Sequence, residues 1–208
     1  MTLVLASTSP RRYQILSLLT LPFLMVSPDG SEEAAEGRAP AEEALFQARR
    51  KAASVAAQFP GAVLIGSDTL ISLDEARIGK PKDVDGARDI LRRLRGRVHE
   101  VATAVAMVQG KRAVETVETA RVRMREFSDQ ELEAYLATGD SLDKAGAYSV
   151  QGLGRSLIAG LDGDYLAVMG LPLRAVATGL RELGCPVPVD VERVYEERNF
   201  LNWKTFES

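Results

Sequence analysis

The stretch LVLASTSPRR, residues 3–12, sets the pattern of the fold. It opens with four apolar residues, Leu3 to Ala6, a run long enough for a buried strand. Ser9 and Pro10 follow, and a serine N-cap with proline at the first helical position is a preferred way to begin a helix. The apolar residues after them share one helical face. The stretch therefore predicts a strand followed directly by a helix.

Arg11 and Arg12 fall in the first turn of that helix. Cations at a helix N-terminus oppose the macrodipole and lose a few tenths of a kcal/mol, roughly. A bound anion would make the arginine pair stabilising, because free backbone N–H groups, the Ser7 hydroxyl and two guanidinium groups would converge on that anion. A solvated arginine pair on an exposed turn is the more common situation. Taken alone, these residues leave both interpretations open.

The rest of the chain continues to alternate between strand and helix patterns. Two long strand patterns joined at Gln109-Gly110 form a hairpin, which argues against a purely parallel sheet. The fold class is therefore α/β with a mixed sheet. The predicted strands are residues 3–6, 62–66 (ending at 67–69), 70–73, 98–108 and 112–125, and the predicted helices are residues 10–19, 41–58, 84–95, 128–137 and 172–183.

Asp68 is a candidate site residue because it follows a buried strand. Ligands of α/β sheets gather beyond the carboxyl ends of strands. An aspartate that caps a turn is equally common at such a position. Lys51 lies in the later half of the predicted helix 41–58, and Pro81 is expected to hold Lys80 extended.

The composition excludes several classes of protein and of catalytic site. The chain has 208 residues and a formal net charge of −3, which predicts one domain or two small packed lobes and argues against a protein that coats a polyanion. A single histidine, His99, excludes two-histidine zinc hydrolases, and a single cysteine, Cys185, excludes an internal disulfide. No apolar run approaches about 18 residues and no secretory signal is evident, so we expect a cytoplasmic protein without a membrane partner.

Seven short strings occur in order along the chain: LASTSPRR (5–12), GSDT (66–69), GKP (79–81), GRVHEVAT (96–103), DKAGAY (143–148), QG (151–152) and GLPL (170–173). Together they resemble the Maf family of nucleoside triphosphate pyrophosphatases. The resemblance runs from about residue 3 to residue 183. Each string alone is weakly specific, whereas the ordered set at compatible spacing is highly specific.

The resemblance implies an elongated mixed β-sheet with flanking helices that form two lobes around a cleft, related to the inosine triphosphatase type. It implies hydrolysis of a nucleoside triphosphate to the monophosphate and pyrophosphate, with a divalent metal, Mg²⁺ or Mn²⁺, in a homodimer. The charge balance, in turn, leads us to expect no nucleic-acid partner. Residues 1–186 are then expected to be a single catalytic domain. Residues 187–208 form a tail with no counterpart in the resemblance and no assigned role.

Asp68 matches the family's essential aspartate, described as a proton acceptor. We favour metal binding and water orientation for it, since a carboxylate beside a metal and lysines is a poor base. Glu33 is a candidate second metal ligand, with Glu32 as an alternative, and a plain surface charge run explains both almost as well. The matching phosphate-side residues are Ser7, Arg11, Arg12, Lys51 and Lys80. His99 is expected to be structural, and Lys144 either a site residue or a partner of Asp140 or Asp143.

Three positions bear on the choice of nucleotide: Arg12, Thr69 and Gln151. Each matches the dTTP/UTP-hydrolysing type within the resemblance. The amide of Gln151 offers a donor and an acceptor, which suits the edge of uracil or thymine. Without the resemblance, a side chain at a strand end that bonds to the local backbone is the preferred interpretation of Gln151. Two alternatives remain: a 7-methyl-GTP pyrophosphatase, and a nucleotide-binding regulator of cell division or septum formation.

Overall fold

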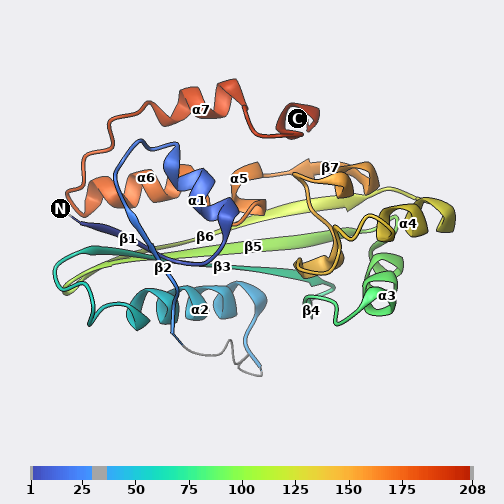
Figure 1. The fold of residues 1–208 in the computed structure, drawn as a ribbon, viewed down its shortest axis with the longest axis horizontal. Helices are drawn as coiled ribbons and strands as arrows, with labels where there is room; N and C mark the ends of the chain where they lie inside the picture. The colour runs from blue at the N-terminus through green and yellow to red at the C-terminus, as the bar shows by residue number, and fades with distance from the viewer. Residues whose placement is uncertain (1, 30–36, 207–208) are drawn as a thin grey trace. The chain divides into compact units, whose positions relative to one another are not determined.

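The computed structural model describes residues 2–29 and 37–206. Within them, seven strands form one sheet in the order β2-β1-β3-β5-β6-β7, with β4 paired to β3 (Figure 1). The strands are β1 (Leu3–Ala6), β2 (Leu24–Val26), β3 (Val63–Leu73), β4 (Ala76–Ile78), β5 (Val98–Gln109), β6 (Arg112–Met124) and β7 (Ile158–Asp162).

Helices connect most of these strands. The α-helices are α1 (Pro10–Ser17), α2 (Pro40–Ser54), α3 (Val84–Leu94), α4 (Asp129–Leu136), α5 (Tyr165–Val168), α6 (Leu173–Glu182) and α7 (Val191–Glu197). Three short 3₁₀ helices accompany them: η1 (Ala145–Ala147), η2 (Leu153–Leu157) and η3 (Trp203–Thr205).

The sheet is mixed, as the sequence predicts. Strand β1 pairs parallel with β2 and β3, whereas β3 pairs antiparallel with β4 and β6 pairs antiparallel with β7. The turn between β5 and β6 contains Gly110 with φ of 59°. That left-handed conformation suits glycine, which has no Cβ to clash with the backbone.

Helix starts follow the predicted caps. Ser9 caps α1 and its Oγ accepts a hydrogen bond from the Arg12 N–H at 3.4 Å. Ser128 and Glu131 form the capping box of α4. Helix α2 ends at Ser54 and not near residue 58, because the chain then forms tighter turns in which the N–H groups of Ala56, Gln58 and Phe59 donate to the carbonyl three residues back.

The prediction that a strand ends at residues 67–69 is wrong. Residues 63–73 form the single strand β3. Its pairing with β1 ends at the Ala6–Gly66 register, while β5 continues as its neighbour on the other side. Asp68 thus lies beyond the carboxyl end of β1 but inside its own strand, with one edge of the strand released from pairing.

Two compact units divide the chain. Unit 1 contains residues 1–69, 102–118 and 166–197, and unit 2 contains residues 70–101, 119–165 and 198–208. In unit 1, α2 covers one face of the strands and α1 and α6 cover the other (Figure 1). Small and branched apolar side chains fill the space beneath α2, namely Val4, Ala6, Ala52, Val55, Ala62 and Leu64. Their small volume lets the helix approach the sheet closely.

Unit 2 contains the one histidine of the chain, His99, with 1% of its surface exposed. Its Nε2 lies 2.6 Å from the Tyr148 hydroxyl. Burial lowers the pKa of the imidazole to about 4 and raises that of the Tyr148 hydroxyl. His99 therefore remains neutral near pH 7 and has a structural environment, as expected from the sequence.

This burial predicts a pH-dependent stability. An unfolded histidine binds a proton below about pH 6.5, whereas folded His99 does so only below about pH 4. The contribution of neutral His99 to the free energy of unfolding is complete above about pH 6.5. It is lost as the pH falls from about 6.5 to about 4. We expect wild type to lose about 2 kcal/mol more unfolding free energy than His99→Gln between about pH 7.5 and pH 5. Urea titrations of both proteins measure this difference, and equal losses would contradict it.

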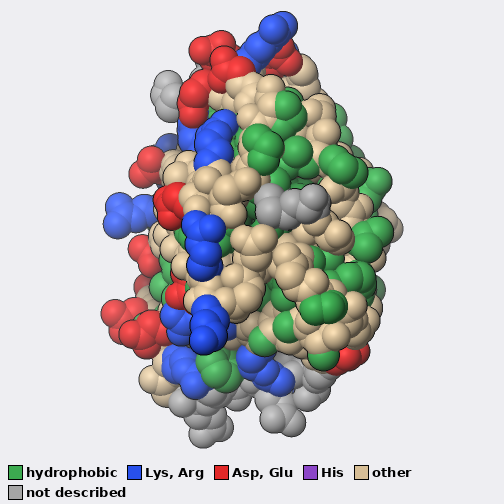
Figure 2. Space-filling view, turned by 90° about the vertical axis from the view of Figure 1, so that its left-hand side faces the viewer, with side chains coloured by type: hydrophobic (Ala, Val, Ile, Leu, Met, Phe, Trp, Pro, Cys, Tyr) green, Lys and Arg blue, Asp and Glu red, His purple; other side chains and the backbone are tan. Residues whose placement is uncertain are grey.

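The surface drawn in Figure 2 carries charges of both signs. Lys and Arg side chains run along one side of this face with Asp and Glu side chains between them, and hydrophobic side chains occur in small groups. The mixture agrees with the nearly balanced composition of 26 basic and 29 acidic residues. In the described part of the chain, no helix has both the length and the apolar character needed to cross a bilayer.

Candidate functional site in unit 1

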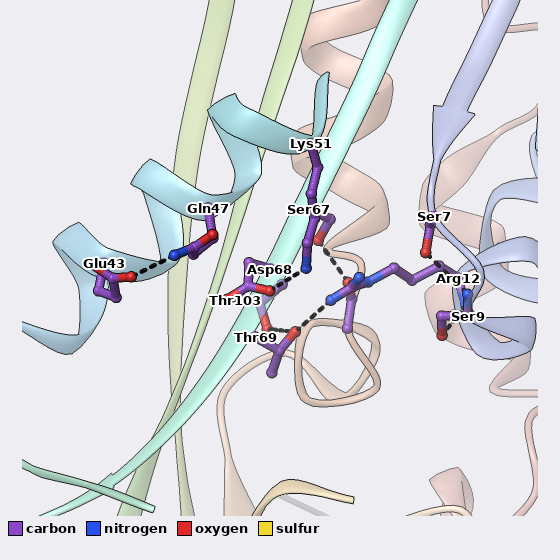
Figure 3. A network of polar contacts seen from close by, with 11 residues as sticks. Ser7, Ser9, Arg12, Glu43, Gln47, Lys51, Ser67, Asp68, Thr69 and Thr103 are labelled. Carbon is purple, nitrogen blue, oxygen red and sulfur yellow. Dashed lines mark hydrogen bonds and ion pairs between the residues drawn. The ribbon is translucent and has the colours of Figure 1, made fainter. Parts of the chain in front are cut away.

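A buried ion pair forms the centre of the candidate site. Lys51 Nζ lies 2.6 Å from Asp68 Oδ1, and the two side chains are 12% and 10% exposed. Lys51 comes from α2 and Asp68 from β3 (Figure 3). Removing two charges from water is unfavourable unless they pair closely, so this contact fixes the position of both groups.

Gly66 explains how helix and strand come so close. A Cβ built on Gly66 would lie 2.1 Å from the Ala48 carbonyl oxygen and 2.7 Å from the Ala52 nitrogen. Both atoms belong to the backbone of α2 and cannot rotate away. Only glycine therefore permits the approach that brings Lys51 to Asp68.

A polar stripe leads along α2 to this pair. Glu43, Gln47 and Lys51 are spaced four residues apart, so they share one face of the helix. Gln47 Nε2 donates to Glu43 Oε1 at 2.7 Å (Figure 3). Arg38 pairs with Glu43 Oε2 at 3.1 Å. Glu43 and Gln47 are both buried. This stripe orders α2 on the sheet with its buried polar groups satisfied.

Arg12 approaches β3 from the other side. Its Nε donates to the Gly170 carbonyl at 2.9 Å, and its Nη2 donates to Thr69 Oγ1 at 3.3 Å. Ser67 Oγ donates to the same carbonyl at 2.8 Å. Figure 3 shows the guanidinium of Arg12 and the ammonium of Lys51 both directed toward the middle of β3. Two cations from separate helices thus contact consecutive residues of β3, Lys51 at Asp68 and Arg12 at Thr69.

A chain of hydroxyls fixes the Thr69 side chain. Thr103 Oγ1 donates its hydrogen to the Ala167 carbonyl at 2.7 Å, and it lies 2.9 Å from Thr69 Oγ1. Because a hydroxyl has one hydrogen, Thr69 must donate to Thr103 and accept from Arg12. Each hydrogen bond of this network is therefore donated in the same direction, from the Arg12 guanidinium through Thr69 and Thr103 to the Ala167 carbonyl.

Ser7 and Arg11 lie in the same unit. Ser7 is 3% exposed and its Oγ accepts a hydrogen bond from the Ser9 N–H at 3.1 Å, which leaves its own hydrogen to donate. Its N–H donates to the Leu5 and Val26 carbonyls. Arg11 is half-buried in the first turn of α1, next to Arg12.

The other site residues predicted from the sequence lie in unit 2 or outside the described residues. Lys80 and Gln151 are in unit 2, where Lys80 is exposed and Gln151 is partly exposed. Glu33 and its alternative, Glu32, lie outside the described residues. Lys144 pairs with Asp143 at 2.5 Å and with Asp140 at 3.0 Å, as one of the two interpretations from sequence expected.

The described residues contain no cluster of three or more His, Cys, Asp or Glu side chains suited to hold a metal ion. Among them, Asp68 has Lys51 as its partner, and that bond uses Oδ1. The Oδ2 atom accepts no hydrogen bond from any residue that the structure describes, so it can bind another ligand. Mg²⁺ is commonly held by one or two carboxylates together with substrate phosphates and waters, so a single carboxylate fits that mode of binding.

Sequence reasoning missed three residues of this network: Ser67, Thr103 and Gly170. All three are part of the strings on which the resemblance was based, which was the available signal. Gly170 has φ of 113°, and a Cβ there would lie 3.3 Å from Arg12 Nε. The glycine therefore presents its carbonyl to Arg12 at a place that disfavours any larger residue.

Comparisons with known proteins agree with these strings. The family model described as Maf-like protein matches residues 2–183. Relatives named dTTP/UTP pyrophosphatase occur in Symbiobacterium thermophilum (40% identity, 89% of this chain and 95% of the relative) and Dictyoglomus turgidum (41%, 88% and 96%). Another, in Aquifex aeolicus, is 43% identical over 88% of this chain and 96% of its own length.

Among solved structures, a HAM1 protein from Coxiella burnetii matches 61% of this chain and 74% of its own, with 15% identity and a TM-score of 0.39. That likeness is too low to support an argument. The family model and the three relatives are sufficient: each covers most of the sequence, and the relatives share about two residues in five with it. The chain belongs to the Maf family.

Proposed function

We propose that this protein hydrolyses dTTP and UTP to the corresponding monophosphate and pyrophosphate. The observation that carries the proposal is the buried Lys51–Asp68 pair with Arg12 directed at the same part of β3. Support also comes from relatives about 40% identical that are named dTTP/UTP pyrophosphatase. We assign the catalytic domain to residues 1–186.

The charges of the site suit attack at the α-phosphorus. Attack of water there builds negative charge on the non-bridging oxygens and on the leaving pyrophosphate. Arg12 and Arg11 can bind phosphate oxygens through planar guanidinium groups, whereas Lys51 supplies a point charge. Ser7 can donate its hydroxyl hydrogen to a phosphate oxygen. We add Lys80 to this set from its place in the GKP string.

Asp68 is proposed to orient the attacking water. Lys51 holds its Oδ1, which fixes the direction of the remaining oxygen. We propose that Asp68 also holds a divalent cation, Mg²⁺ or Mn²⁺, with Glu33 as a second ligand. When bound, such an ion supplies positive charge to the triphosphate.

Base recognition is assigned to Gln151 and Thr69, with Arg12 holding the Thr69 hydroxyl. A glutamine amide presents one donor and one acceptor to the base edge. Uracil and thymine offer the complementary pair, an N–H beside a carbonyl. A glutamate at this place would offer acceptors only.

We expect wild type to release pyrophosphate from dTTP and UTP, with Mg²⁺ present, faster than from GTP, CTP or 7-methyl-GTP. Gln151→Glu should lower kcat/KM for UTP about 100-fold, because a carboxylate faces a carbonyl that it cannot bond. Pyrophosphate release across the five nucleotides, with dTTP and UTP in separate assays, measures both effects.

The matched control is Gln109→Glu, the same change in the partly exposed last residue of β5. It should leave the order of substrates unchanged. Faster turnover of 7-methyl-GTP or another purine nucleotide by wild type would refute the pyrimidine preference. Tight nucleotide binding without any product would instead indicate a regulator.

A further inference from the structure

The C-terminal segment 198–206 contacts the loop that carries Gln151. Asn202 Nδ2 donates to the Val150 carbonyl at 3.1 Å and to the Gly152 carbonyl at 3.1 Å. These two carbonyls lie on either side of Gln151 in the chain. The two hydrogens of one Asn202 amide thus bond the carbonyls before and after Gln151, the residue to which we assign base recognition.

Asn202 is suited to this contact by its backbone. It has φ of 67° and ψ of −9°, in the left-handed region that asparagine tolerates better than most residues. The segment lies beyond the family match, which ends at residue 183. The contact is therefore an addition to the part of the chain shared with the family.

Buried aromatic contacts fix the segment around Asn202. Trp203 stacks on Tyr165 with ring centroids 5.2 Å apart, and the Tyr165 hydroxyl donates to the Leu201 carbonyl at 2.6 Å. Arg155, which follows the Gln151 loop, donates to the Thr205 carbonyl at 2.8 Å. Asn202 is thus held from both sides in sequence, so its amide has a defined position.

The loop itself is closely packed. A Cβ on Gly152 would lie 2.4 Å from Asp140 Oδ2, and the Gln151 N–H donates to Ser149 Oγ at 3.3 Å. The side chain of Gln151 makes no hydrogen bond with any residue that the structure describes. The protein therefore fixes only the backbone from which this side chain extends, and the carbonyls on both sides of that backbone are held by Asn202.

We propose that Asn202 is a positioning residue for Gln151, so that the C-terminal segment sets the selectivity for the base. This inference rests on the proposed function, because it takes Gln151 as the group that recognises uracil and thymine. Asn202 acts through the Val150 and Gly152 carbonyls, which accept the hydrogen bonds of its side-chain amide.

The test uses the full chain with Asn202→Gly. Glycine adopts the left-handed backbone freely, so the change removes the amide and leaves the turn. We expect KM for UTP to rise about tenfold with kcat unchanged, the loss of two hydrogen bonds that orient the loop. The ratio of kcat/KM between UTP and CTP should fall by the same factor. Asn202→Asp keeps the size but has no donor, and should behave likewise.

Lys204→Ala is the matched control, since Lys204 is an exposed neighbour in the same segment. It should leave KM and the UTP/CTP ratio at their wild-type values. Hydrogen exchange of the 149–154 peptide gives a readout without substrate, and it should be faster in Asn202→Gly than in wild type or the control.

The outcomes separate this inference from the proposed function. If Gln151→Ala lowers the UTP/CTP ratio but Asn202→Gly does not, the inference is overturned and the proposed function stands. An equal loss for both nucleotides with a lower melting temperature would show a merely structural role and also overturn it. If Gln151→Ala leaves the ratio unchanged, Gln151 does not recognise the base, and the inference is overturned together with that part of the proposed function. If wild type hydrolyses neither nucleotide, the proposed function itself fails, and the inference fails with it.

Discussion

Asp68→Asn is expected to lower kcat for dTTP about 1000-fold while KM changes little. Asparagine has the same shape but no negative charge, so it orients neither the attacking water nor a cation in the same way. The change also removes the Asp68 charge that lies beside the Lys51 ammonium, whose side chain is 12% exposed. Steady-state rates of pyrophosphate release measure the loss, and thermal unfolding shows whether the fold persists.

Asp74→Asn provides the control for this change. Asp74 follows the same strand, and its 74% exposed side chain pairs with Arg97. It should retain full activity, because an exposed ion pair contributes little to structure or chemistry. Full turnover by Asp68→Asn would remove Asp68 from the catalytic role that we propose for it.

Gly66→Ala is expected to lower the free energy of unfolding by about 3 kcal/mol. The added methyl group would lie 2.1 Å from the Ala48 carbonyl oxygen, so α2 must move away from β3. That movement separates Lys51 from Asp68, and we expect activity to fall even in the fraction that remains folded. Urea unfolding and pyrophosphate release at a temperature well below the transition measure the two effects separately.

Gly79→Ala is a matched substitution with no such clash. A Cβ on Gly79 meets no described atom within 4 Å, and its φ is not left-handed. Its unfolding free energy should stay within about 0.5 kcal/mol of wild type. If Gly66→Ala were equally neutral, the close approach of α2 would not be what holds the Lys51–Asp68 pair together.

Local signals predicted most of the elements. Ser9-Pro10 and the Ser128–Glu131 box marked helix starts correctly, because a cap depends on residues within one turn. The continuous strand through Asp68 was missed, since the GSDT string looks like a turn when read alone. What keeps it extended is pairing with strands distant in sequence, and local propensity carries no information on that.

The candidate site was predicted in part. The Lys51–Asp68 pair joins residues named from sequence, but the resemblance and not the spacing pointed to both. The carbonyl of Gly170 was missed as a partner of Arg12, because a backbone acceptor has no signature of its own in a sequence. The contact of Asn202 with the Gln151 loop was equally hidden, since the family resemblance ends before it.

The chain passes between the two units five times, at residues 69/70, 101/102, 118/119, 165/166 and 197/198. Neither unit is therefore a continuous piece of the gene, and no single truncation can yield one of them alone. Attempts to express half of this protein should give insoluble or degraded material. Genetic dissection must instead proceed by point substitution or by circular permutation.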